Sequence, residues 1–263
     1  MRIAVTIFAC VSLAACSLLG QSPTAMSCPQ QSSPGSFCEV RETTLPALAS
    51  LNVDSRANGA ISIRGGGRTE ILVRAMVRAR GNTDSEAKNL AGHVAVDTSA
   101  GRVRAEGPAA GNWSVSYEIL VPSRTNLLLN AKNGGVSVTG VESSIEFHAV
   151  NGGISLRNVG GFVHGETVNG GVSVSLSDKK WSGQGMDAST TNGGVKMNVP
   201  EDLCAELDLG TVNGGINMKL PNAPRASGGK LRATLGAGGP QIRIRTQNGG
   251  VTVSAPEAVQ RRS

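Results

Sequence analysis

Aromatic side chains are scarce in this chain of 263 residues, because Phe, Trp and Tyr together make up only 3% of it. Large globular cores usually depend on aromatic bulk, so the interior must be built from slimmer residues. The formal net charge is +6 at pH 7, and basic residues gather late in the chain, between Arg225 and Arg262, with no aromatic residues interleaved among them. Since single-stranded nucleic acids bind by stacking on aromatic rings, we expect no nucleic-acid partner.

Recognisable catalytic motifs are also missing. The sequence has no Gly-x-Ser-x-Gly elbow, no His-Glu-x-x-His pair, no phosphate-binding loop and no CxxC spacing. Acidic residues are scattered singly along the predicted strands, whereas glycoside hydrolases need paired carboxylates in a groove. We therefore expect a protein that is not an enzyme and uses no cofactor. The alternative is a carbohydrate-active enzyme, a polysaccharide lyase or hydrolase on a β-helix.

What the chain has instead is a short repeat. Asn-Gly-Gly followed by alternating apolar residues occurs six times, at first every 18 residues. The six copies begin at Asn133, Asn151, Asn169, Asn192, Asn213 and Asn248. A unit this short cannot bury a core by itself, so the copies must stack as a solenoid.

Apolar residues recur at fixed distances from each Asn. They lie six residues before it and three and five residues after it, and such spacing by two is the period of a strand with one buried face. Each repeat thus predicts a strand, an Asn-Gly-Gly corner and a second strand, because Asn and Gly tolerate positive φ. Asn-Gly is also typical of β-hairpins, and a meander of hairpins is the alternative.

The fold class that we predict is all-β: a parallel β-helix, or solenoid, with coils of about 18 residues and Asn-Gly-Gly corners. Like residues of successive coils would lie about 4.8 Å apart. The six corner Asn side chains would then form a structural ladder in which each amide bonds the next one. A ligand-binding row is the other interpretation of this column.

The first 16 residues read as an export signal. Arg2 precedes an apolar run from Ile3 to Ala14, and the ending Leu-Ala-Ala-Cys16 resembles the lipobox of bacterial lipoproteins. By that resemblance Cys16 becomes the lipidated N-terminus. Acyl chains on Cys16 would hold the protein on a membrane, in the outer membrane or on the periplasmic side of the envelope. An ordinary signal peptide cut near Ala15 is the alternative.

Composition divides the rest of the chain into four parts. Residues 17–38 are rich in Ser, Pro and Gln and predict a flexible tether. Residues 39–122 predict the N-terminal β-rich part of the solenoid, 123–256 the regular repeats, and 257–263 a tail. Cys28 and Cys38 close a small loop, where a disulfide suits an oxidising compartment.

One short helix is predicted in the N-terminal half. Thr83-Asp84-Ser85-Glu86 is a capping-box pattern, Ala87 to Ala91 suits a helix, and Gly92 ends it. Strands are expected on both sides, among them Ile71 to Arg80 and the alternating run from Trp113 to Pro122.

The order of these features resembles a known family. A lipoprotein signal is followed by strands, a short helix containing Glu86-Ala87, the segment Val115–Pro122, and repeated Asn-Gly-Gly-Val-Ser-Val. This order is similar to the bacterial "putative adhesin" family of β-solenoid domains of unknown function, over about residues 39–255. The resemblance implies a parallel, flattened β-helix on an exported protein. It brings no catalytic residues.

Histidines and carboxylates gather at outward-facing positions. Stacking would place Glu146 beside His164 and His148 beside Glu166, with Asp187 one coil further on. Imidazole and carboxylate ligands suit zinc, so these five residues are a candidate metal site. The alternative is a solvent-exposed lattice of opposite charges.

We therefore expect a lipid-anchored envelope protein with a structural, adhesin-like or binding role. Its repetitive β-solenoid surface would meet a glycan, a cell-wall polymer or an envelope protein, and the lipid anchor would bind the membrane.

Overall fold

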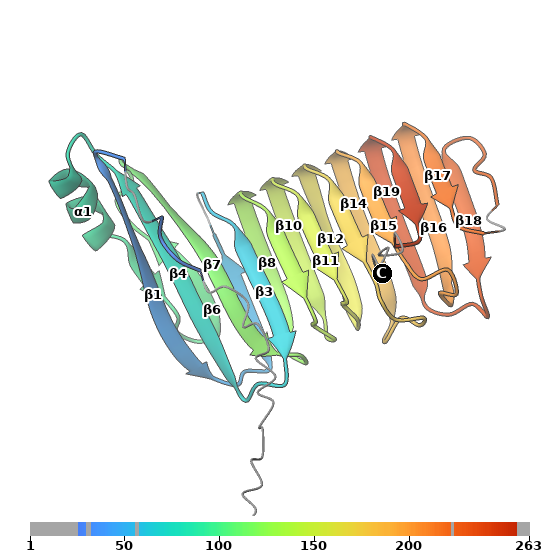
Figure 1. The fold of residues 1–263 in the computed structure, drawn as a ribbon, viewed down its shortest axis with the longest axis horizontal. Helices are drawn as coiled ribbons and strands as arrows, with labels where there is room; N and C mark the ends of the chain where they lie inside the picture. The colour runs from blue at the N-terminus through green and yellow to red at the C-terminus, as the bar shows by residue number, and fades with distance from the viewer. Residues whose placement is uncertain (1–25, 30–32, 56–57, 222–223, 257–263) are drawn as a thin grey trace, which may run out of the picture.

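The computed structural model describes residues 26–29, 33–55, 58–221 and 224–256, which form two sheets and one short helix (Figure 1). Each sheet has ten strands within these residues. The first sheet runs in the order β1 (Ser36–Pro46), β4 (Glu70–Arg80), β7 (Asn112–Pro122), β3 (Ile61–Gly66), β9 (Val136–Thr139), β11 (Ile154–Arg157), β13 (Val172–Ser175), β15 (Val195–Asn198), β20 (Val251–Ser254) and β17 (Ile216–Lys219). The second runs in the order β18 (Lys230–Leu235), β16 (Ala205–Asn213), β19 (Gln241–Asn248), β14 (Gly185–Asn192), β12 (Phe162–Asn169), β10 (Ile145–Asn151), β8 (Asn126–Asn133), β2 (Ser50–Asp54), β6 (Arg102–Glu106) and β5 (Ala95–Asp97).

Some of the predicted features lie outside the described residues. These are the lipidation site Cys16, the signal sequence and the tail at 257–263. Among the residues that are described, no helix has the length and apolar character needed to span a bilayer.

The repeated part is built from rungs. A rung is one strand of the second sheet, an Asn-Gly-Gly segment and the next strand, which lies in the first sheet. Neighbouring rungs pair in parallel and in register, so Ile145 lies between Leu127 and Val163, and Val136 lies beside Ile154. These columns are buried between the two sheets. The chain therefore has a nearly all-β, solenoid-like fold with one short helix.

The rungs are not stacked in chain order. β19 lies between β14 and β16 (Figure 1), and β20 pairs with β15 on one side and β17 on the other. The expectation that each repeat stacks on the one before it is therefore wrong for the last rung. Two observations explain the difference. β18 pairs antiparallel with the outer edge of β16 and occupies that position. The insertion also puts Arg243 between Asp187 and Asp208, which would otherwise face each other as like charges.

Close packing explains the first glycine of the Asn-Gly-Gly segments, and among these six glycines only Gly249 has positive φ. Among the described residues, only Ala100 and Asn158 are non-glycine residues with positive φ, so none of the six repeat asparagines has it. A Cβ placed on Gly152 would lie 2.1 Å from the carbonyl oxygen of Gly134 in the neighbouring rung. The same contact would be 2.2 Å for Gly170 against Gly152. The first glycine of each segment is required because no side chain fits between rungs.

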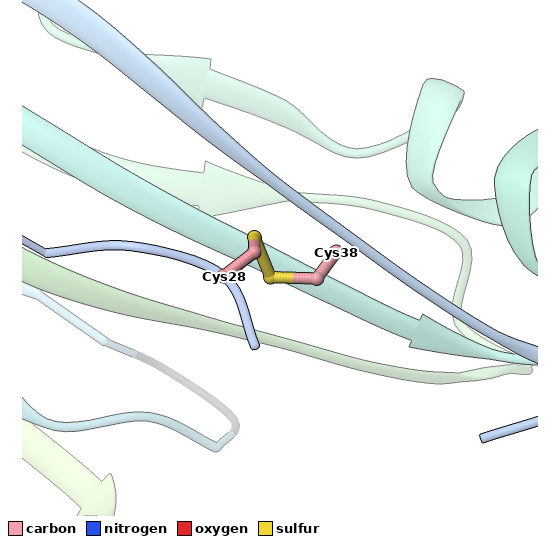
Figure 2. The surroundings of a disulfide bond; sticks show 2 residues. All are labelled: Cys28 and Cys38. Atoms are coloured by element: carbon pink, nitrogen blue, oxygen red, sulfur yellow. A yellow bond between two sulfur atoms is a disulfide. The ribbon is translucent and has the colours of Figure 1, made fainter. Parts of the chain in front are cut away.

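The N-terminal part differs from the predicted continuous solenoid. β1, β4 and β7 pair antiparallel, and β7 then pairs in parallel with β3, which leads into the repeated rungs. β1 already begins at Ser36, so the predicted tether, 17–38, ends too late. A disulfide joins Cys28 to Cys38 on β1 (Figure 2) and ties the preceding segment to the sheet.

The helix α1 (Asp84–Gly92) packs against β1 and β4. Its start follows the predicted capping pattern. The backbone N–H of Glu86 donates to Thr83 Oγ1 at 3.2 Å, and the Glu86 carboxylate accepts from the backbone N–H of Asn82 at 2.8 Å. Arg41 on β1 donates to the carbonyl of Ala91 at 2.9 Å, which satisfies a group at the helix end.

We expect Gly152→Ala to destabilise the fold strongly. The added methyl would overlap a backbone carbonyl that the neighbouring rung cannot move without losing its own register. The loss in free energy of unfolding should be roughly 3 kcal/mol, the upper part of the range for overpacking. Guanidinium unfolding measures it.

Gly215→Ala is the matched control, because a Cβ on Gly215 meets nothing within 4 Å. This variant should stay within about 0.5 kcal/mol of the parent chain. Equal stabilities of the two variants would contradict the packing explanation.

Candidate functional site

The outer face of the second sheet carries the polar residues that the sequence placed on one patch. The parallel register puts Glu146 beside His164 and His148 beside Glu166. Asp187 follows His164 on the next strand. Because side chains alternate along a strand, these residues point away from the buried columns.

His148 lies between two carboxylates. Its Nε2 is 3.1 Å from Glu146 Oε1 on the same strand, and its Nδ1 is 3.8 Å from Glu166 Oε1 on the neighbouring strand. All three side chains are open to solvent, so these contacts contribute little to stability. They do fix an imidazole and two carboxylates on one small area.

The other two residues of the predicted metal site have different partners. His164 stacks on Phe162, with ring centroids 6.2 Å apart and planes 4° from parallel. Asp187 Oδ2 lies 3.5 Å from Arg243 Nη1, on the strand inserted beside β14. Within the described part of the chain, no group of three or more His, Cys, Asp or Glu side chains is placed to hold a metal ion.

Apolar side chains border this polar area. Phe162 is 44% exposed, Val150 43% and Val168 40%. A shallow groove of about 350 Å³ lies next to His148, and Lys132, Val150, Glu166 and Val168 contribute to its lining. The binding face, as we call this area, consists of Glu146, His148, Phe162, His164, Glu166 and the two valines. It combines aromatic, apolar and charged groups within reach of one ligand.

A buried carboxylate lies further along the same sheet. Asp208 is only 6% exposed. Arg245 Nη2 donates to its Oδ2 at 2.7 Å, and the nitrogens of Arg243 and Arg232 lie 3.4 and 3.6 Å from its carboxylate oxygens. The sequence did not identify this cluster. The available signal was the like charges of Asp187 and Asp208 in one column, which require a cation between them.

The arginines control the charge of Asp208. Burial alone raises the pKa of this carboxyl, but the hydrogen bond from Arg245 and the charges of Arg245, Arg232 and Arg243 outweigh burial. The pKa of Asp208 therefore lies below its ordinary value, and the side chain is ionised at neutral pH.

The six repeat asparagines form one row with Asn58. Each Nδ2 donates to the Oδ1 of a neighbouring asparagine at 2.8 or 2.9 Å. The row runs Asn58, Asn133, Asn151, Asn169, Asn192, Asn248 and Asn213. The predicted chain order therefore fails at its last two members, where Asn248 bonds Asn192 and Asn213 ends the row.

A second set of hydrogen bonds between rungs supports the row, and the spacing of the sequence alone did not reveal it. Four threonine hydroxyls, each two residues before a repeat asparagine, donate to the carbonyl of the first glycine in a neighbouring rung. The distances are 2.7 to 2.9 Å. The donors are Thr167, Thr190, Thr211 and Thr246. Threonine at this position is therefore explained by contact between rungs.

Comparison with known proteins gives one family and several distant structures. A family profile described as Toastrack DUF4097 matches residues 40–254. A "putative cell adhesion protein" from Clostridium sporogenes is 11% identical with a TM-score of 0.45, and the match covers 84% of this chain and 100% of that one. A "putative adhesin" from Bacteroides fragilis is 11% identical with a TM-score of 0.37, covering 84% and 97%. A "putative lipid binding protein" from Parabacteroides distasonis is 10% identical with a TM-score of 0.32, covering 84% and 97%. No curated protein matches the chain.

We expect Asp208→Asn to lower the free energy of unfolding by roughly 2 kcal/mol at pH 7, because three arginines lose their counter-charge. The folded-state pKa of Asp208 is depressed, so its stabilisation is present above the unfolded pKa of about 3.9. It is lost as the pH falls through the folded pKa. The gap between parent and variant should therefore close in acid.

Urea unfolding from pH 7 to pH 3 measures this gap. Glu201→Gln is the control, because Glu201 is exposed and makes no ion pair with the described residues. A gap for Asp208→Asn that is independent of pH would show that the charge of Asp208 is not what stabilises the cluster.

Proposed function

We propose that this chain, which belongs to the Toastrack family DUF4097, is a lipid-anchored envelope protein that binds a polymer through its binding face. We infer also that the rungs form a parallel β-helix with Asn-Gly-Gly at its corners. The parallel registers and the asparagine row support this description.

The leader supports the anchor. Leu13-Ala14-Ala15-Cys16 follows a short apolar run, and this arrangement resembles the lipobox of bacterial lipoproteins. Two or more acyl chains on one cysteine give stable membrane attachment, whereas one chain gives only reversible binding. The segment between Cys16 and the disulfide at Cys28 would hold the sheets at the surface of the membrane.

The observation that carries the binding role is the exposed ring pair Phe162–His164 next to Glu146, His148 and Glu166. An exposed aromatic surface beside hydrogen-bonding groups suits a ligand that is apolar on one face and hydroxylated at its edges. A sugar ring has this character. The parallel rungs make the surface flat and regular, which suits an extended chain of sugars, so an envelope glycan or cell-wall polymer is the proposed partner.

The lipid anchor is tested by metabolic labelling with an alkyne fatty acid in a bacterial host. The parent protein should carry the label and remain in the membrane fraction. The variant Cys16→Ser should lose all of the label and be released from membranes. Cys10→Ser is the matched control and should keep both properties. Label retained in Cys16→Ser would contradict lipidation at this residue.

Polymer binding is tested with the released Cys16→Ser form on an array of bacterial envelope glycans. The variants Phe162→Ala and His164→Ala should each weaken binding by roughly tenfold, the effect of losing one well-packed aromatic contact. Ser155→Ala and Ser173→Ala, on the outer face of the first sheet, are the controls and should bind normally.

The same samples also test the enzymatic alternative. Binding without release of reducing ends supports the proposed role, and reducing ends that accumulate with time support a carbohydrate-active enzyme. If no glycan binds, or if the two ring variants bind as well as the parent, the proposal is overturned. Recovery of an envelope protein on the binding face would then identify the other class of partner.

A further inference from the structure

The two ends of the asparagine row are not equivalent. Asn58, at one end, accepts a side-chain hydrogen bond from Asn133. Each interior member of the row donates one such bond and accepts another. Asn213 donates to Asn248 Oδ1 at 2.8 Å, but within the described residues nothing donates to its own Oδ1. β19 is inserted between β14 and β16 (Figure 1), so Asn213, not the later Asn248, is the end of the row.

The backbone at this end is also unpaired. In the other repeats, the N–H of the first glycine donates to the carbonyl of the asparagine in the next rung at 2.9 or 3.0 Å. The donors are Gly134, Gly152, Gly170, Gly193 and Gly249, and Gly59 makes the same bond to Asn133. Gly214 would need a further rung as its acceptor, and its N–H has no partner among the described residues.

The surroundings of Asn213 are open. Val212 is 74% exposed, and Gly214 is exposed whereas the first glycine of each other repeat is half-buried. The antiparallel strand β18 covers β16 only as far as Thr211, whose N–H donates to Gly229 O at 2.8 Å. β17 after this segment is the edge strand of the first sheet. The segment can therefore move more easily than the same segment held between two rungs.

We infer that Asn213 is a site of spontaneous deamidation in the folded protein, and that the row protects the other asparagines from the same reaction. The reaction is an attack by the backbone nitrogen of Gly214 on Cγ of Asn213. The new N–C bond closes a succinimide, the nitrogen gives up its proton, and the side-chain amide leaves as ammonia. Water then opens the ring and leaves aspartate or isoaspartate.

At the interior asparagines of the row, hydrogen bonds restrain both the glycine nitrogen and the side-chain amide. An interior glycine nitrogen is tied to a carbonyl of the next rung, and an interior side-chain amide is fixed on both sides, so attack would break several bonds together. At Asn213 the side-chain amide is held on one side only, by its bond to Asn248, and the N–H of Gly214 is not tied to a further rung, although the Asn213 carbonyl still accepts from the N–H of Gly249 at 3.0 Å. Deamidation replaces the Asn213 amide, which donates to Asn248 Oδ1, by a carboxylate that repels this oxygen. The reaction therefore loosens the terminal rung.

The chain supplies its own matched control. Residues 150–154 and 212–216 have the same sequence, Val-Asn-Gly-Gly-Ile, so the intrinsic reactivities of Asn151 and Asn213 are equal. Asn151 lies inside the row, with neighbours on both sides. Any difference between the two sites in the folded protein therefore comes from the structure.

The experiment incubates the whole folded chain in mildly alkaline buffer and follows each Asn-Gly pair by peptide mapping and mass spectrometry. Asn213 should be converted at least roughly tenfold faster than Asn151 and Asn248, the effect of the missing bonds on the barrier. In denaturant, Asn151 and Asn213 should react at equal rates.

Three results would overturn the inference. They are equal rates at Asn151 and Asn213 in the folded chain, fastest conversion at Asn248, or a preference for Asn213 that persists in denaturant. The variant Asn213→Gln should abolish the fast phase and leave the slow sites unchanged. A fast phase that survives in this variant would also contradict the assignment.

Discussion

The contact between successive Asn-Gly-Gly segments is the constraint on which the repeated part depends. Strands of one sheet lie about 4.8 Å apart, and at that spacing the carbonyl of Gly134 occupies the place of any side chain on Gly152. With glycine there, the segments approach closely enough for asparagine amides and threonine hydroxyls to bridge the rungs. A steric requirement thus sets the register, and the hydrogen bonds and the buried apolar columns follow from it.

The sequence allowed much of this to be predicted, because the repeat has a period that strands share. The buried columns at Val136 and Ile154, the helix start at Thr83 and the pairing of Glu146 with His164 all follow from spacing alone. Stacking order does not, because identical segments such as those at Asn151 and Asn213 contain no information about their neighbours. The reason for glycine was also not available from the sequence, since close approach and positive φ favour the same residue.

Contacts with Arg243 and Phe162 explain why the five residues of the predicted metal site do not converge on one point. Five residues were expected on one patch, and the register does bring them to the same face. Arg243, from the far end of the chain, pairs with Asp187, and Phe162 stacks on His164, so the ligands do not converge. Local spacing places Phe162 and His164 on one face of β12, but it predicts neither the ion pair with Arg243 nor the stacking of the two rings. The first requires knowledge of which strand is inserted beside β14, and the second requires side-chain orientations at the start of β12.

Insertion of the last rung has a consequence for how the molecule folds. A solenoid whose units stack in order can grow from its N-terminus as the chain is synthesised, each unit docking on a finished one. Here stacking in chain order stops after β14 and β15. The strands that pair with them, β19 and β20, are the last to be synthesised. β16 and β17 can take their final positions only after β19 and β20 have paired with β14 and β15. If they pair with β14 and β15 earlier, β19 and β20 must displace them. Completion of this end is therefore a concerted, non-local event, so the C-terminal rungs should form a single cooperative unit while the earlier ones assemble progressively.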